Sequence, residues 1–292
     1  MYTAYKSAGV ALITPFHKDG SIDFKSLERL IEYQITNNIG YFVVLGTTGE
    51  SATLNKDEKV AIIDFVVELV NKRKPIVLGI GGNNTQEVVN CINSTNLDGI
   101  EAILSVAPSY NKPSQSGIFQ HYKYIANASP LPIIIYNVPS RTGVNISAET
   151  TLKIANELKN VIGIKEASGN LPQIMHIINN KPKNFLVISG DDALTLPTMA
   201  LGGDGVISVI ANAYPKEFSK LIHFCLDGKY DEAKTIHYKL LDIINAIFLE
   251  GSPAGIKAAL EILKLAPNNL RLPLVPVGKT TNSLISKLIQ NL

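Results

Sequence analysis

The sequence predicts a single (β/α)8 barrel followed by a short helical region. Eight short runs rich in Val and Ile alternate with eight segments of helical period, and no Gly/Ser-rich linker separates them. These units use nearly all of residues 10–227 of a 292-residue chain. The runs show no clear apolar–polar alternation, which is typical of parallel strands buried on both faces. Eight β-then-α units favour a closed barrel, and an open doubly wound sheet is the alternative.

The expected strands are short apolar runs. They are Val10–Pro15, Tyr41–Gly46, Ile76–Gly81, Ala102–Ala107, Ile133–Val138, Val161–Glu166, Phe185–Gly190 and Gly205–Ile210. The expected helices between them are Ser26–Asn38, Lys56–Lys72, Thr85–Asn96, Ser116–Asn127, Ala148–Leu158, Leu171–Asn180, Ala193–Leu201 and Pro215–Asp227. Asn55, with Glu58 three residues later, and Ser147 are start signals for two of these helices.

The remainder of the chain predicts three further helices, Tyr230–Leu249, Pro253–Leu265 and Thr280–Leu292. We therefore expect a catalytic barrel over residues 1–228 and a C-terminal helical region over residues 229–292.

Composition excludes several classes of protein. Hydrophobic residues make up 46% of the chain and charged residues 18%, which excludes a disordered chain. A net charge of +2 without a Lys/Arg-rich stripe argues against a nucleic-acid partner. Two cysteines, Cys91 and Cys225, cannot build a disulfide framework or a zinc site. No apolar run approaches the roughly 18 residues of a membrane span, so we expect a cytoplasmic protein and no membrane partner.

Lys165 is the most informative residue, because it follows the apolar run Val161–Ile164. An unpaired charge in a buried strand is costly. One interpretation is a lysine at a strand end that extends its ammonium to water. The other is a desolvated amine with a lowered pKa, suited to forming an imine with a ketone.

Tyr136 also lies in an apolar run and, taken alone, is typical of a core tyrosine. Counting back by twos makes Ile134 the same-face neighbour of Tyr136 and Gly163 that of Lys165. If both side chains face inward from neighbouring strands, the phenol lies beside the amine and can move protons during imine formation.

Two further motifs follow expected strands, where a barrel carries its chemistry. The glycines of Gly46–Gly49 allow close approach to a ligand, and the Thr47 and Thr48 hydroxyls can bind a carboxylate; an ordinary turn is the alternative. Asp191 and Asp192 could hold Mg²⁺, yet no third carboxylate or histidine clearly joins them.

The chain resembles the dihydrodipicolinate synthase family over nearly its whole length. The matching motifs are Gly46–Ser51, Pro108–Pro113, Tyr136–Gly143, Gly163–Ala167, Ser189–Asp192, Gly205–Val209 and Leu270–Pro273. Singly, the Gly-Thr-Thr-Gly-Glu stretch and the lysine are shared with the wider superfamily of pyruvate-dependent lyases. Ser252 departs from the family, since many members have Asn before the corresponding proline.

The resemblance implies a lyase of lysine biosynthesis that uses no cofactor and condenses pyruvate with aspartate 4-semialdehyde. Lys165 would carry the covalent imine, and Tyr136 would transfer protons. Thr47 and Tyr110 would complete a hydroxyl relay, with Tyr110 supplied by a neighbouring subunit of a homotetramer. The expected substrate-binding positions are Thr48, the backbone around Ile207, Gly190, and Arg141 for the semialdehyde carboxylate.

Two alternatives from different classes stay open. Another pyruvate-dependent aldolase, such as N-acetylneuraminate lyase or a keto-deoxy-sugar aldolase, would share the lysine, but sugar-cleaving relatives generally lack an arginine equivalent to Arg141. A ligand-binding barrel without activity would not need the complete set of Lys165, Tyr136, Thr47 and Tyr110.

The resemblance also bears on feedback by lysine, which binds regulated relatives at a dimer interface. Ser51, Ala52, Asn83 and Glu87 match that site. Lys56 stands where regulated members have a histidine, and Ser109 stands where they have a tyrosine. We expect weak or absent feedback, because Lys56, with Lys59 nearby, repels a cationic effector and Ser109 lacks an aromatic hydroxyl.

Overall fold

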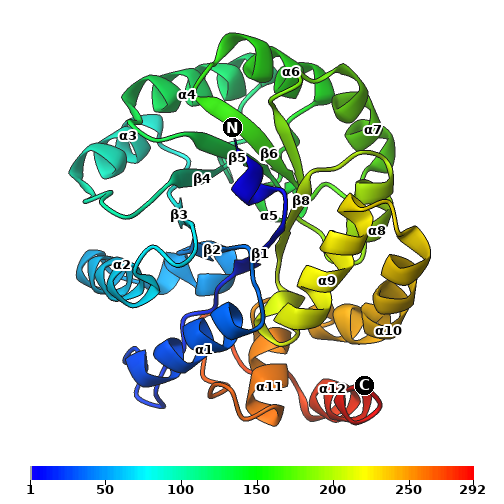
Figure 1. Ribbon diagram of the computed structural model, residues 1–292. Coiled ribbons are helices and arrows are strands. Elements are labelled where there is room, and N and C mark those ends of the chain that lie inside the picture. The colour runs from blue at the N-terminus through cyan, green and yellow to red at the C-terminus, as the bar shows by residue number, and fades with distance from the viewer. Residues whose placement is uncertain (1) are drawn as a thin grey trace.

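Eight parallel strands close into a barrel in the computed structural model, which describes residues 2–292 (Figure 1). Each strand pairs with the next along the chain, and β8 pairs with β1. The strands are β1 (Ala8–Ala11), β2 (Tyr41–Val44), β3 (Ile76–Gly79), β4 (Ala102–Val106), β5 (Ile133–Asn137), β6 (Val161–Glu166), β7 (Leu186–Ser189) and β8 (Gly205–Ser208). The predicted barrel is confirmed, and the open sheet is excluded.

Helices surround the barrel and continue past it at the C-terminus (Figure 1). They are α1 (Phe24–Thr36), α2 (Lys56–Val70), α3 (Thr85–Ser94), α4 (Gln115–Ala128), α5 (Pro139–Thr142), α6 (Ala148–Glu157), α7 (Leu171–Asn180), α8 (Thr195–Ala200), α9 (Pro215–Leu226), α10 (Tyr230–Phe248), α11 (Ala254–Ile262) and α12 (Lys279–Gln290). The three predicted C-terminal helices are present as α10–α12. None of the helices in residues 2–292 is both long and apolar enough to cross a membrane.

The predicted helix starts agree with the caps of two helices. The Asn55 side chain accepts the backbone N–H of Glu58, whose carboxylate accepts the N–H of Asn55, so that α2 begins with a capping box. The Ser147 side chain caps α6 by accepting the N–H of Thr150.

The first strand differs from its prediction, because β1 is Ala8–Ala11 rather than Val10–Pro15. The apolar residues that follow it are buried in a loop rather than a strand. Ile13 N–H donates to Asn212 Oδ1 at 3.2 Å, and the Thr14 hydroxyl donates to the Gly49 carbonyl at 2.7 Å. Apolar periodicity reports burial, so it could not separate this loop from the strand.

Apolar side chains fill the barrel interior and one of its ends. Tyr5, from the short 3₁₀ helix Thr3–Tyr5, packs edge-on against Tyr41 with ring centroids 5.3 Å apart. Val43, Leu104, Ile134 and Tyr136 continue the same buried interior cluster toward the ends of the strands. The open end of the barrel is therefore the end where the strands finish.

Candidate active site

Tyr136 and Lys165 lie side by side at the ends of β5 and β6. The strand register pairs Ile134 with Gly163 and Tyr136 with Lys165. This agrees with the prediction from the sequence that the two side chains face inward from neighbouring strands. Both side chains are buried, and Lys165 Nζ lies 4.3 Å from the centroid of the Tyr136 ring. The phenol and the amine therefore share one small volume inside the barrel.

Burial lowers the pKa of the Lys165 amine to about 8. Removing an ammonium from water favours its neutral form. The Asp192 carboxylate opposes this shift, while the Arg141 guanidinium adds to it. About a tenth of Lys165 is thus neutral at pH 7. The neutral form is the one that attacks a carbonyl.

Burial raises the pKa of the Tyr136 phenol to about 12. Arg141 and a hydrogen bond with the Thr47 side chain act in the opposite direction. Tyr136 therefore holds its proton at neutral pH and can donate it to an oxygen that becomes negative beside Lys165.

Thr47 and Thr48 occupy a 3₁₀ turn, Thr47–Gly49, that follows β2. Glu50 ends this turn in the left-handed region with φ 53° and is 3% exposed. Its carboxylate pairs with the fully buried Lys257 of α11 and accepts the backbone N–H of Arg271 at 3.2 Å. The C-terminal helical region thus anchors the threonine turn at the barrel mouth.

Arg141 lies on α5, a four-residue helix that sequence reasoning did not predict. Such a short helix has no apolar period, and Pro139 at its first position was the available signal. Arg141 Nη2 donates to the Ser252 carbonyl at 3.3 Å. Ser252, the departure from the family pattern, therefore contacts the arginine through its backbone.

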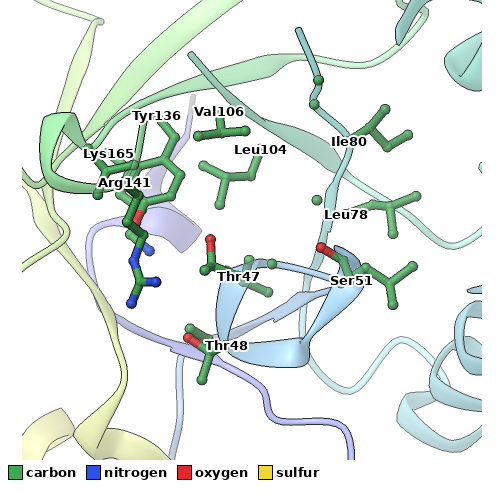
Figure 2. Close-up of a pocket in the computed structure, with 18 of the residues that line it drawn as sticks. Thr47, Thr48, Ser51, Leu78, Ile80, Leu104, Val106, Tyr136, Arg141 and Lys165 are labelled. Carbon is green, nitrogen blue, oxygen red and sulfur yellow. The ribbon is translucent and has the colours of Figure 1, made fainter. Parts of the chain in front are cut away.

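One cavity of about 950 Å³ contains these groups. The predicted residues that line it are Thr47, Thr48, Tyr136, Arg141, Lys165 and Gly190, and Figure 2 shows five of them, with Tyr136, Arg141 and Lys165 grouped opposite Thr47. A Cβ at Gly190 would lie 3.0 Å from Cε and Cγ of Lys165, so only glycine leaves that side chain its space. The cavity continues past Ser51 between α2 and α3, to Lys56 and Glu87.

Two predicted site residues lie elsewhere in the described chain. Tyr110 is 90% exposed, has φ 71°, and does not line the cavity. Ile207 is buried in the apolar barrel interior, and Val209, two residues later, lines the cavity instead.

Sequence reasoning missed the role of Asp192, which it considered only as a metal ligand. Its Oδ2 accepts the backbone N–H of Val209 at 3.0 Å and of Ile210 at 2.7 Å. Burial raises its pKa to about 6, against the hydrogen bonds from Ile210, Ser208 and Val209. Asp192 thus fixes the turn after β8 and keeps a negative charge near Lys165 at neutral pH. The signal available in the sequence was the acidic pair Asp191–Asp192 at the end of the seventh expected strand.

Comparison with known proteins decides the family. A model of the dihydrodipicolinate synthetase family matches residues 5–292. The chain belongs to this family. The family prediction and the lyase class it carries are confirmed.

Curated relatives agree with this assignment. A 4-hydroxy-tetrahydrodipicolinate synthase of Parabacteroides distasonis is 54% identical over 98% of this chain and 97% of its own length. One from Azobacteroides pseudotrichonymphae is 52% identical over 97% of this chain and 95% of its own length. These relatives do not favour the sugar-aldolase alternative.

Solved structures of the family share the fold. The dihydrodipicolinate synthase of Thermotoga maritima has a TM-score of 0.96 and 40% identity, and covers 99% of this chain and 98% of its own. An Acinetobacter baumannii synthase complexed with pyruvate has a TM-score of 0.95 and 39% identity, and covers 98% of each chain.

Proposed function

We propose that this protein is a 4-hydroxy-tetrahydrodipicolinate synthase of lysine biosynthesis, which condenses pyruvate with L-aspartate 4-semialdehyde without a cofactor. The observation that carries the proposal is the buried pair of Lys165 and Tyr136 in the cavity that Arg141 borders. Lys165 Nζ lies 4.3 Å from the centroid of the Tyr136 ring. The curated relatives that bear this name match nearly the whole chain.

In the first half of the reaction, the neutral Lys165 amine attacks the ketone carbon of pyruvate. Tyr136 donates a proton to the ketone oxygen, which leaves as water when the iminium forms. Thr48 and the backbone between Ile207 and Val209 hold the pyruvate carboxylate, and Gly190 leaves room for the imine.

In the second half, the iminium acts as an electron sink, so the pyruvate methyl group loses a proton and an enamine forms. The enamine carbon attacks the aldehyde of the semialdehyde, whose carboxylate is bound by Arg141 through two parallel hydrogen bonds. The semialdehyde's own amine then displaces Lys165 and closes the ring. Thr47 passes protons between Tyr136 and the solvent side of the cavity.

A coupled assay tests this proposal. Purified protein given pyruvate and aspartate semialdehyde should form the heterocyclic product, which a reductase that uses a nicotinamide cofactor reports by absorbance. Cleavage of N-acetylneuraminate or a keto-deoxy sugar to pyruvate, without heterocycle formation, would contradict it.

The exposure of Tyr110 supports a second part of the proposal, that the working enzyme is a homotetramer in which Tyr110 reaches a neighbouring subunit's site. An aromatic side chain that is 90% exposed on a loop with positive φ is suited to contact another chain. Sedimentation should show an assembly, and Tyr110→Phe should keep the assembly while losing much of the activity. A fully active monomer would contradict this part.

A further inference from the structure

Glu166, next to Lys165 on β6, is a buried carboxyl group to which the proposed reaction gives no step. Its side chain is 1% exposed. Neighbouring residues of a strand point to opposite faces, so Glu166 faces the outside of the barrel where Lys165 faces the inside. Asn137 follows Tyr136 on β5 and likewise faces the outside of the barrel. The strand register pairs Asn137 with Glu166.

Three neutral groups hold this carboxylate. The backbone N–H of Ser168 donates to Oε1 at 2.6 Å, Asn137 Nδ2 donates to Oε2 at 3.0 Å, and Gln173 Nε2 donates to Oε2 at 3.1 Å. No ion pair within residues 2–292 includes Glu166. The donors are amides with fixed directions, so the carboxylate fixes the positions of the elements that carry them.

The same network extends to the segment that follows the Arg141 helix. Asn137 Nδ2 donates to Asn145 Oδ1 at 2.8 Å, and Asn137 Oδ1 accepts the backbone N–H of Ile146 at 2.9 Å. Asn145 Nδ2 donates to Gln173 Oε1 of α7 at 2.8 Å. Side chains of β5, β6, α7 and the segment after α5 therefore meet directly behind the Tyr136–Lys165 pair.

The pairing of β5 with β6 needs side-chain contacts of this kind to fix its register. The ladder is irregular at its lower end, where Ile133 pairs with Val161 but Ile134 pairs with Gly163. A slip of one residue turns every side chain of a strand to the other face, and here it would remove Lys165 from the cavity. The Asn137–Glu166 contact lies at the upper end of the same ladder, one residue beyond the reacting pair.

We propose that Glu166 is a positioning residue, whose hydrogen bonds to Asn137, Ser168 and Gln173 set the approach of the Tyr136 phenol to the Lys165 amine. This inference rests on the proposed function, because it assigns Glu166 to the imine chemistry of that pair.

Glu166→Gln is the sharpest test, because it preserves shape and replaces one acceptor oxygen by an NH₂ group that faces donors. The measurement is the rate of covalent trapping with pyruvate, in which borohydride reduces the imine to a stable secondary amine. A misplacement of about 1 Å should slow trapping at saturating pyruvate about 10- to 100-fold. The pyruvate concentration for half-maximal trapping should change far less, since Glu166 does not line the cavity.

A second substitution offers rescue. In the Asn137→Asp, Glu166→Gln double variant, the amide introduced on β6 can donate to the carboxylate introduced on β5. The amides of Asn145 and Gln173 can reverse to complete the network. Trapping should return to within about threefold of the wild-type rate, since complementary partners restore a coupled interaction.

Asn160→Ala is the matched control at the opposite end of β6. Asn160 Nδ2 donates to the carbonyls of Ser129 and Leu131, each at 3.0 Å. This variant should lose thermal stability and trap pyruvate at the wild-type rate. If Glu166→Gln does not fold, Gln173→Met, on the partly exposed α7 position, removes one donor and should slow trapping about tenfold.

Wild-type protein that traps no pyruvate would refute the proposed function. It would also refute the role of Glu166, which depends on that function. If the wild type does trap pyruvate, trapping by Glu166→Gln at the wild-type rate would overturn the inference. So would equal slowing in Asn160→Ala, or a double variant as slow as Glu166→Gln, because each would indicate general destabilisation.

Discussion

At the scale of single residues, the site works by setting the charge of one amine. Burial lowers the pKa of Lys165 to about 8, Asp192 opposes that shift and Arg141 adds to it. Removal of Asp192 should therefore lower the pKa of Lys165, and removal of Arg141 should raise it. The pH dependence of imine formation should shift in the same direction. Arg141 also carries the selectivity for the second substrate in the proposed reaction.

The first prediction concerns pH. Because only the neutral amine attacks the ketone, trapping at limiting pyruvate should rise about tenfold between pH 7 and pH 9 in the wild type, through a pKa near 8. Asp192→Asn removes a charge that favours the ammonium, so the midpoint should fall. Its amide oxygen can still accept from Val209 and Ile210. A midpoint that rises in this variant would show that Asp192 does not stabilise the ammonium.

The second prediction concerns Arg141. Arg141→Ala removes a charge-assisted hydrogen bond to the semialdehyde carboxylate, worth about 1.5–3 kcal/mol, so kcat/KM for the semialdehyde should fall about 10- to 150-fold. Trapping with pyruvate alone should persist. Steady-state rates, measured with each substrate varied in turn, separate the effect on the semialdehyde from any effect on pyruvate. Loss of pyruvate trapping would contradict the prediction, because it would assign Arg141 to the first half of the reaction.

At the scale of elements, strand ends carry the chemistry and the C-terminal helices hold one of those ends in place. Lys257 of α11 is buried, its pKa is lowered to about 8 by burial, and its ammonium donates to the Asn269 carbonyl at 2.8 Å as well as pairing with Glu50. Breaking this pair leaves an uncompensated charge under the threonine turn.

The third prediction follows from that pair. Lys257→Met should lower the free energy of unfolding by about 3–5 kcal/mol, because Glu50 is left buried and unpaired. Adding Glu50→Gln should recover part of the loss. Lys234→Met, which removes an exposed pair with Asp231, should leave the free energy of unfolding almost unchanged. Urea unfolding measures all three variants, and a Lys257→Met protein as stable as the control would contradict the account.

Strand and helix order could be predicted from the sequence because buried parallel strands are nearly continuous apolar runs. The predicted boundaries of β6 and α7 agree fully with the structure. The predicted first strand begins two residues late and ends four residues late, because the apolar loop after β1 is also buried. Helix α5 was missed because four residues show no period. A lysine in an apolar run gave the core of the site.

The partners behind Lys165 could not be predicted, because their contacts join segments far apart in the chain. The hydrogen bond from Asn137 to Glu166 and the pair of Glu50 with Lys257 depend on how strands and helices meet in space. Strand periodicity carries no such information. The division of the chain at residue 228 stays a prediction.

At the scale of the whole molecule, the cavity reaches from Lys165 to the groove between α2 and α3, where Lys56, Lys59 and Glu87 lie. This groove therefore holds two ammonium groups and one carboxylate.

The fourth prediction is weak or absent feedback by lysine. Repulsion from Lys56 and a hydrogen bond lost at Ser109 together should weaken lysine binding about 30-fold or more. A lysine titration of the steady-state rate at fixed pyruvate measures this, and the Lys56→His, Ser109→Tyr double variant should gain sensitivity. Strong inhibition of the wild type at sub-millimolar lysine would contradict the prediction.

The central claim is that Lys165, and no other lysine, forms the imine with pyruvate. Lys257 makes the test stringent, because its pKa is also lowered to about 8 and yet it does not line the cavity. Borohydride reduction with pyruvate, followed by peptide mass spectrometry, should place the added mass on Lys165 alone, and Lys165→Ala should gain none. Label on Lys257 or another lysine, or label retained by Lys165→Ala, would contradict the account.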